Sequence, residues 1–149
     1  MILYHYTTGQ KLVQIIESGY LIPSAAGGKP GEVPLLWFSK SKDYEPTALK
    51  MMQTAAGQFF ILTPEQQREL VGNVRFALDT EKFHVMPWPT ACKTAGISNR
   101  ERKTLERVGA DQGGNCKNWF ATDDYLPVWM LRVEVETDHG WMPLEEATV

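Results

Sequence analysis

Cysteine is scarce in this sequence, and long apolar runs are absent from it. The 149 residues include two cysteines, Cys92 and Cys116, which form no Cys-x-x-Cys pair and match no zinc-ligand spacing. This excludes a disulfide scaffold and the usual structural zinc sites. No apolar run approaches the roughly 20 residues that cross a bilayer, and the N-terminus does not have the pattern of a secretory signal. We therefore expect a cytoplasmic protein with no membrane partner.

The two common glycine-rich nucleotide motifs are also missing. The sequence contains neither G-x-G-x-x-G nor G-x-x-x-x-G-K-[ST], which disfavours Rossmann and P-loop nucleotide binding. Its three histidines, His5, His84 and His139, share no i, i+4 spacing of the kind that holds a metal on a helix. The formal charge of 15 − 18 = −3 argues against general electrostatic binding of nucleic acid. Any nucleotide must be held in another way, and we expect no metal.

The overall composition is that of one soluble domain. The sequence is 43% hydrophobic and 22% charged, both ordinary values for a globular chain. A chain of this length can bury roughly 70% of the surface that its unfolded form exposes, so it can build a core without staples. It is rich in aromatic residues, with five Trp, five Tyr and six Phe. We expect a single domain that spans residues 1–149.

Hydrophobic periodicity and capping signals predict a series of short elements. In the first half they are a strand at 2–7, a helix from Thr8 to Gly19, an extended piece at 20–23, a surface loop and candidate lid at 24–34, a buried strand at 35–39, a helix from about 44 to 54, a strand at 59–62, a helix at 63–70 and a half-buried strand at 74–79. In the second half they are loop over most of 80–97, a helix from Ser98 to Gly109, a loop at 109–117, and strands at 118–122 and 129–136. This irregular order predicts a compact α+β domain.

The most specific pattern lies in the first 44 residues. His5 is on the first expected strand, a helix and the segment Gly19-Tyr20-Leu21-Ile22-Pro23 follow, and Trp37-Phe38-Ser39-Lys40-Ser41 precedes Tyr44. This pattern resembles the ADP-ribosyltransferase superfamily, in particular its diphtheria-toxin and poly(ADP-ribose) polymerase branch. The resemblance implies a split β-sheet core with short helices, and NAD as the substrate.

The same resemblance implies roles for individual residues. His5 would hydrogen-bond the ribose next to nicotinamide, because one imidazole can supply both a donor and an acceptor. Trp37 stands where the family has the tyrosine of its His-Tyr-Glu triad, and Tyr44 would be the second ring against nicotinamide, a flat cation that binds well between π faces. Ser41 matches the serine that supports the carboxamide. The full set of expected cofactor-binding residues is His5, Tyr6, Thr7, Trp37, Ser39, Ser41 and Tyr44.

The sequence departs from the family at the catalytic glutamate, whose position Trp119 occupies. Three interpretations are open. In the first, the acid comes from elsewhere, with Asp111 and Asp123 joining His5 as catalytic candidates and Asp124 or Glu45 as further acids. In the second, the chain transfers a single ADP-ribose to a protein or nucleic-acid acceptor without a strong acid. In the third, it is a catalytically silent module that binds NAD, ADP-ribose or a partner.

Structural interpretations stand beside these functional ones. Trp37 lies in an apolar strand and could be a core residue, and Trp129 is expected to pack in the last strand. The basic residues of the expected helix at 98–109, namely Arg100, Arg102, Lys103 and Arg107, alternate with Glu101 and Glu106. A solvated face is the first interpretation of that helix, and a patch for phosphate, nucleic acid or an acidic partner is the second. Arg75 is a lone candidate for phosphate.

Overall fold

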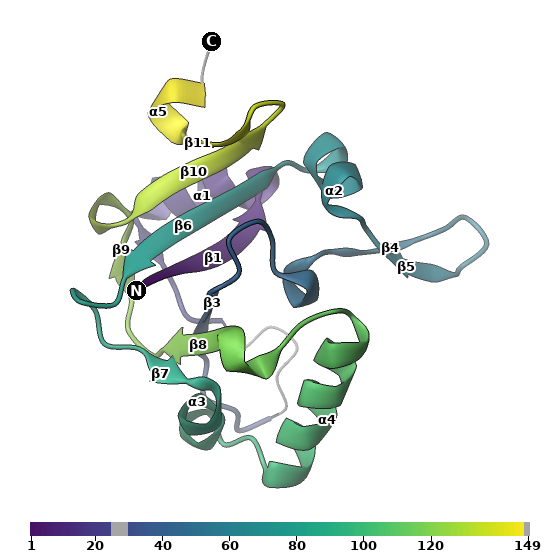
Figure 1. The fold of residues 1–149 in the computed structure, drawn as a ribbon, viewed down its shortest axis with the longest axis vertical. Helices are drawn as coiled ribbons and strands as arrows, with labels where there is room; N and C mark the ends of the chain where they lie inside the picture. The colour runs from purple at the N-terminus through teal and green to yellow at the C-terminus, as the bar shows by residue number, and fades with distance from the viewer. Residues whose placement is uncertain (25–29, 148–149) are drawn as a thin grey trace.

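Strand β1 (Ile2–Thr8) lies inside the main sheet, as its alternating residues predict. The computed structural model describes residues 1–24 and 30–147. In this part of the chain, seven strands form one antiparallel sheet in the order β11-β10-β6-β1-β3-β8-β7 (Figure 1). The other six are β3 (Leu36–Ser39), β6 (Asn73–Asp79), β7 (Met86–Pro87), β8 (Trp119–Thr122), β10 (Arg132–Thr137) and β11 (Gly140–Pro143). Together, this sheet and the helices make the chain a compact α+β domain.

One face of this sheet carries the main hydrophobic core. Leu3, Phe76 and Leu78 are fully buried there, and helix α1 (Gly9–Ser18) contributes Leu12 and Ile15 to the same cluster. In Figure 1, α1 lies behind β6 and β10. The two-stranded sheet of β2 (Tyr20–Leu21) and β9 (Leu126–Pro127) adds further buried leucines to this core.

The helix ends that local signals predict are confirmed. Thr8 Oγ1 accepts a hydrogen bond from the Lys11 amide at the start of α1. Gly19 ends α1 at φ 79°, in the left-handed region that glycine adopts without strain. Helix α2 (Pro64–Leu70) begins with a capping box in which Thr63 and Gln66 each bond the other's backbone amide.

A buried arginine organises the opposite face of the sheet. Arg75 is 7% exposed, its Nε donates to Glu134 at 2.8 Å, and its guanidinium also donates to the Lys42 carbonyl. The guanidinium carbon lies 4.1 Å from the centre of the Tyr4 ring and 4.4 Å from that of Trp141, so it is sandwiched between two π faces. These contacts favour a structural role for Arg75 over phosphate binding, because Nε and one terminal nitrogen donate inside the fold and two rings pack against the guanidinium.

Backbone pairing within the main sheet is shortest between β1 and β3. These two strands share a single register pair, Tyr4 with Ser39, whereas β1 pairs with β6 along its whole length and β3 does so with β8. Beside that pair, His5 Nδ1 donates to the Trp37 carbonyl at 2.7 Å, so a side chain takes the place of a ladder bond. The sheet thus consists of two parts that meet at one narrow junction.

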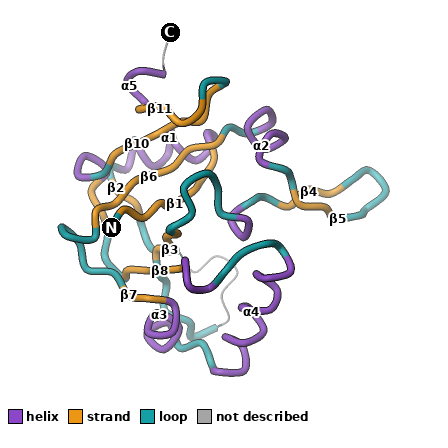
Figure 2. Tube along the Cα trace, in the orientation of Figure 1, coloured by secondary structure: helices purple, strands orange, loops and turns teal. Residues whose placement is uncertain are grey.

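The second part of the sheet is covered by helices from the C-terminal half. Helix α3 (Trp88–Ala95) packs on β8 through a small core of Leu35, Ala91, Ala95 and Ala121, and α4 (Asn99–Asp111) follows it (Figure 2). The remaining short elements are η2 (Cys116–Asn118), η3 (Val128–Met130) and α5 (Leu144–Ala147). None of the described helices has the length and apolar character that a membrane crossing needs.

The helix expected at 44–54 is wrong. Glu45 caps only a single 3-10 turn, η1 (Pro46–Ala48), and the chain then forms a hairpin of β4 (Met51–Gln53) and β5 (Phe59–Ile61). Gly57 adopts φ 86° in the turn between these two strands, a conformation that glycine takes without strain. The hairpin projects from the body of the molecule (Figure 1), and its side chains are exposed, with Phe59 at 66%. The strand at 59–61 is confirmed, but its side chains lie outside the core.

Three further expectations from the C-terminal half need correction. Most of the span 80–97 is not loop, because β7 and α3 together occupy residues 86–95, and Pro89 lies in the first turn of α3, where proline is tolerated. Gly109 does not end its helix, which continues to Asp111. Trp129 does not pack in a strand: it lies in η3, outside β10, and is 82% exposed. Of the loop at 24–34 that was a candidate lid, residues 25–29 lie outside the described residues.

Replacement of Arg75 tests the sandwich. Arg75→Gln leaves the buried Glu134 with only the exposed Arg132 as an ionic partner, and should lower the free energy of unfolding by about 3 kcal/mol. The matched control is Arg68→Gln, because Arg68 pairs with the largely exposed Asp138 and should cost about 0.5 kcal/mol. Denaturant titration measures both, and equal losses would contradict the role given to Arg75.

Candidate functional site

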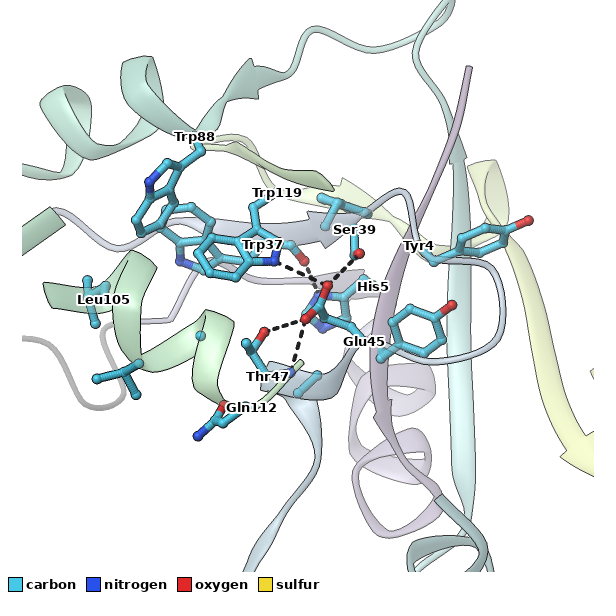
Figure 3. Close-up of a pocket in the computed structure, with 15 residues that line it drawn as sticks. Tyr4, His5, Trp37, Ser39, Glu45, Thr47, Trp88, Leu105, Gln112 and Trp119 are labelled. Atoms are coloured by element: carbon cyan, nitrogen blue, oxygen red, sulfur yellow. Dashed lines mark hydrogen bonds between the residues drawn. The ribbon is translucent and has the colours of Figure 1, made fainter. Parts of the chain in front are cut away.

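Two cavities meet at the narrow junction of the sheet. The first has a volume of about 470 Å³ and is shown in Figure 3. The second has a volume of about 700 Å³. His5, Tyr6, Trp37 and Thr47 line both of them. The two cavities therefore border the same side chains, with His5 among them.

The first cavity, which we call the aromatic cavity, has three tryptophans along one wall. The ring centres of Trp37 and Trp88 are 5.4 Å apart, and those of Trp88 and Trp119 are 5.0 Å apart in an edge-to-face arrangement. Helix α4 closes another side through Leu105 and Val108. Such a lining suits a flat ring, and π faces favour one that carries positive charge.

A glycine allows α4 to approach this wall. A Cβ built at Gly109 would lie 2.9 Å from Trp119 Cζ2 and closer still to Cη2. Gly114, at the end of the following loop, is also crowded, with Trp119 Cζ2 at 3.2 Å and Thr47 Cγ2 at 3.0 Å from a built Cβ. The sequence interpretation of Gly109 as a helix terminator missed this packing role, which depends on a residue ten positions away.

A buried carboxylate lies in the aromatic cavity. Glu45 is 6% exposed and its two oxygens accept four hydrogen bonds, as Figure 3 shows. Oε1 accepts from Ser39 Oγ at 2.8 Å and from Trp119 Nε1 at 3.2 Å. Oε2 accepts from the amide and the hydroxyl of Thr47, at 3.0 and 2.7 Å. Four donors around one carboxylate suit its ionised, acceptor-only form.

The backbone after β3 holds this carboxylate in place. Glu45 is the N-cap of η1, so its side chain bonds the first turn of its own segment. Ser39 Oγ accepts from the Ser41 amide at 3.0 Å, which leaves the Ser39 hydroxyl proton for Glu45. The Ser41 carbonyl in turn accepts from the Tyr6 hydroxyl. The position of the Glu45 side chain is therefore fixed by hydrogen bonds within the folded chain.

His5 is held in one tautomer at the junction of the cavities. Because the Trp37 carbonyl can only accept, Nδ1 carries the proton, and neutral Nε2 is an acceptor. Burial lowers the pKa of His5, the bond to Trp37 opposes this, and the charges of Lys50 and Lys11 lower it further. The ring packs between Phe38 and Phe76, with centres 5.7 and 6.5 Å away.

The second cavity, which we call the lysine cavity, is more polar. Lys11 and Gln14 enter it from α1, and Lys50 from the segment after η1. Thr7, which is buried, lines it beside His5. Partial burial lowers the pKa of Lys50, and the charge of Lys11 adds to that effect. These groups can bind an anion or a polyhydroxyl ligand.

The residues predicted from the sequence fall into three groups. His5, Tyr6, Trp37 and Ser39 line the aromatic cavity, and Thr7 lines the lysine cavity. Ser41 and Tyr44 line neither of the two: Ser41 supports Ser39 from behind, and Tyr44 is 42% exposed over a small hollow with Trp141. Asp111 and Asp123 are exposed, and neither lines either cavity.

Of the acids named from the sequence, Asp111, Asp123 and Asp124 thus lie outside the site, whereas Glu45 lies inside it. A cap residue before a proline is the one local signal that singles out Glu45. Its contact with Trp119 joins residues 74 positions apart, which no local pattern encodes. Within the described residues, no group of three or more His, Cys, Asp or Glu side chains could hold a metal ion. Burial raises the pKa of the Cys92 thiol to about 11, which makes it a poor nucleophile.

The lowered pKa of His5 predicts how stability depends on pH. The unfolded chain binds a proton at this histidine near pH 6.5, whereas the folded chain binds it only at lower pH. The contribution of His5 to the free energy of unfolding is therefore constant above about pH 7.5 and decreases as the pH falls towards about 5.5. His5→Phe should remove that loss. Unfolding free energies at both pH values measure it, and identical pH dependence in the two proteins would contradict the assignment.

Comparison with known proteins adds nothing to this geometry. No protein-family description and no curated protein matches the sequence, and no solved structure matches the fold. The two cavities and the residues that line them are therefore the basis on which a function can be assigned.

Proposed function

We propose that this chain binds NAD, breaks the bond between nicotinamide and ribose, and transfers ADP-ribose to a protein or nucleic-acid acceptor. One observation carries this proposal: an aromatic cavity with a buried carboxylate and a polar cavity with two lysines meet at the fixed imidazole of His5. NAD has the same division, because it joins a flat cationic ring to a ribose and a diphosphate.

The aromatic cavity suits the nicotinamide end. Trp37 and Trp119 offer π faces or edges to a flat ring, and each favourable contact with a cationic ring contributes about 0.5–2 kcal/mol. The attraction is lost when the ring leaves as neutral nicotinamide, which favours its release. We assign the role of the second ring to Trp119, which lines the aromatic cavity, in place of Tyr44, which the resemblance implied.

The junction suits the ribose. His5 lines both cavities, its Nε2 is an acceptor, and the orientation of the ring is set by the bond from Nδ1 to Trp37. A ribose hydroxyl can donate to it, as the resemblance implied. Because the pKa of His5 is lowered, the ring remains neutral near pH 7 and keeps this acceptor.

Glu45 is the best candidate for the missing acid. In the reaction, the electron pair of the glycosidic bond leaves with nicotinamide and positive charge develops on the ribose carbon. The acceptor then gives that carbon an electron pair and loses a proton. A fixed carboxylate stabilises this charge without having to reorganise. Trp119, which holds the family's glutamate position, donates to Glu45, so a carboxylate from another segment reaches the same region.

The narrow junction between β1 and β3 also supports the proposal. The resemblance implied a split sheet, and here the pairing of these strands is limited to Tyr4 and Ser39. The residues around that junction are the ones that the resemblance selected, namely His5 and Trp37. The split sheet and the sequence motifs therefore support the same family, and we propose membership on these grounds.

A catalytically silent binding module is the second candidate. The observation that favours it is the complete satisfaction of Glu45, whose four hydrogen bonds all come from the protein itself. A carboxylate in such a network stabilises structure whether or not it also acts on a substrate. The two candidates differ in one product, free nicotinamide.

Release of nicotinamide tests the proposal. The protein is incubated with NAD and a cell extract, and nicotinamide is measured by chromatography. We expect release, and Glu45→Gln should lower its rate by at least about a hundredfold. Asp111→Asn and Asp123→Asn are matched controls and should stay within about twofold of the parent.

The other outcomes separate the candidates. NAD binding without any release would establish the silent module, and the absence of NAD binding would overturn the whole proposal. Release at the parental rate by Glu45→Gln would show that the acid is not Glu45. Because this substitution places an amide where four donors converge, the unfolding free energy of the variant is measured in parallel.

A further inference from the structure

We propose that Lys11 and Lys50 form a clamp in the lysine cavity for the phosphate groups of a nucleotide. The identity of that nucleotide as NAD rests on the proposed function. The clamp itself does not, because it is a claim about two lysines and any diphosphate that the cavity admits.

The two lysines approach one cavity from different elements. Lys11 lies in the first turn of α1 and Lys50 follows η1, yet both line the cavity that contains His5. They are close enough for their charges to affect each other and His5. Three basic groups around one cavity, with Gln14 and Thr7 as further polar neighbours, form a surface that an anion complements.

In the described part of the chain, neither lysine makes an ion pair, whereas Arg68, Arg75, Arg102 and Arg132 do. Lys50 is half-buried, so its charge loses hydration without gaining a counter-ion, and this is why its pKa is lowered. A phosphate placed between the two lysines would replace the repulsion with attraction.

Glu32 reduces the net positive charge of the lysine cavity. It lines the same cavity and has an interaction of its own. With His5 neutral, the lysines exceed this carboxylate by one positive charge, which is enough to favour a phosphate but not a long polyanion. This balance favours a single nucleotide over nucleic acid as the ligand.

The position of the clamp would also orient a dinucleotide. In NAD, the diphosphate follows the ribose that carries nicotinamide. A clamp next to His5 therefore holds the diphosphate on one side of the junction and directs nicotinamide to the aromatic cavity on the other. The clamp would determine which end of the ligand meets Glu45.

Calorimetric titration with ADP and with adenosine tests the clamp. The parent should bind ADP more tightly than adenosine. Lys11→Gln combined with Lys50→Gln should weaken ADP binding at least about tenfold, with less than a twofold effect on adenosine. Lys103→Gln, at an exposed position on α4 that lines neither cavity, is the matched control and should change neither. ADP binding should also weaken as salt is added.

Unchanged ADP affinity in the double variant would overturn the clamp, as would failure of the parent to bind ADP at millimolar concentration. A 5′-phosphorylated trinucleotide distinguishes the source of the phosphate. If it binds more tightly than ADP with the same dependence on the two lysines, the clamp holds and its ligand is nucleic acid. If ADP binds more tightly, the ligand is a nucleotide.

The clamp and the proposed function can fail separately. Lysine-dependent ADP binding without release of nicotinamide would support the clamp and contradict the enzyme. Release of nicotinamide by the double variant with an unchanged KM for NAD would support the enzyme and contradict the clamp.

Discussion

The hydrogen bond from His5 Nδ1 to the Trp37 carbonyl is the contact on which the site depends. It joins the two parts of the sheet where strand pairing is reduced to one residue pair. Two cavities that share His5 and Trp37 among their lining residues lie beside this junction. The same bond fixes the tautomer of the imidazole and leaves Nε2 as an acceptor. One contact thus serves the fold and the proposed chemistry.

The second constraint is the position of the Glu45 carboxylate, which comes from the segment after β3. Trp119 cannot act as an acid, but its indole N–H holds Glu45, which the turn after β3 brings into the aromatic cavity. Two glycines, Gly109 and Gly114, leave the space that the indole needs against α4 and η1. The indole of Trp119 thus lies in a neighbourhood built around Glu45, which supports the proposal that Glu45 supplies the acid.

The sequence could predict what depends on local signals. The alternation in β1, the caps of α1 and the capping box at Thr63 each lie within a few residues, and each is confirmed. The second strand of the hairpin was predicted, but its first strand at 51–53 was missed because the exposed Met51 and Met52 imitate the apolar stripe of a helix. The contact between Glu45 and Trp119 could not be predicted, because it depends on how distant strands pair. His5 and Trp37 were found through a family resemblance.

A crystal structure with an unreactive NAD analogue would show directly how the ligand lies across the two cavities. We expect the nicotinamide ring to lie in the aromatic cavity against Trp37, with its ribose bonded to His5 Nε2 and near Glu45. The diphosphate should lie between Lys11 and Lys50. An analogue bound elsewhere on the surface, or one whose adenine fills the aromatic cavity, would contradict the account.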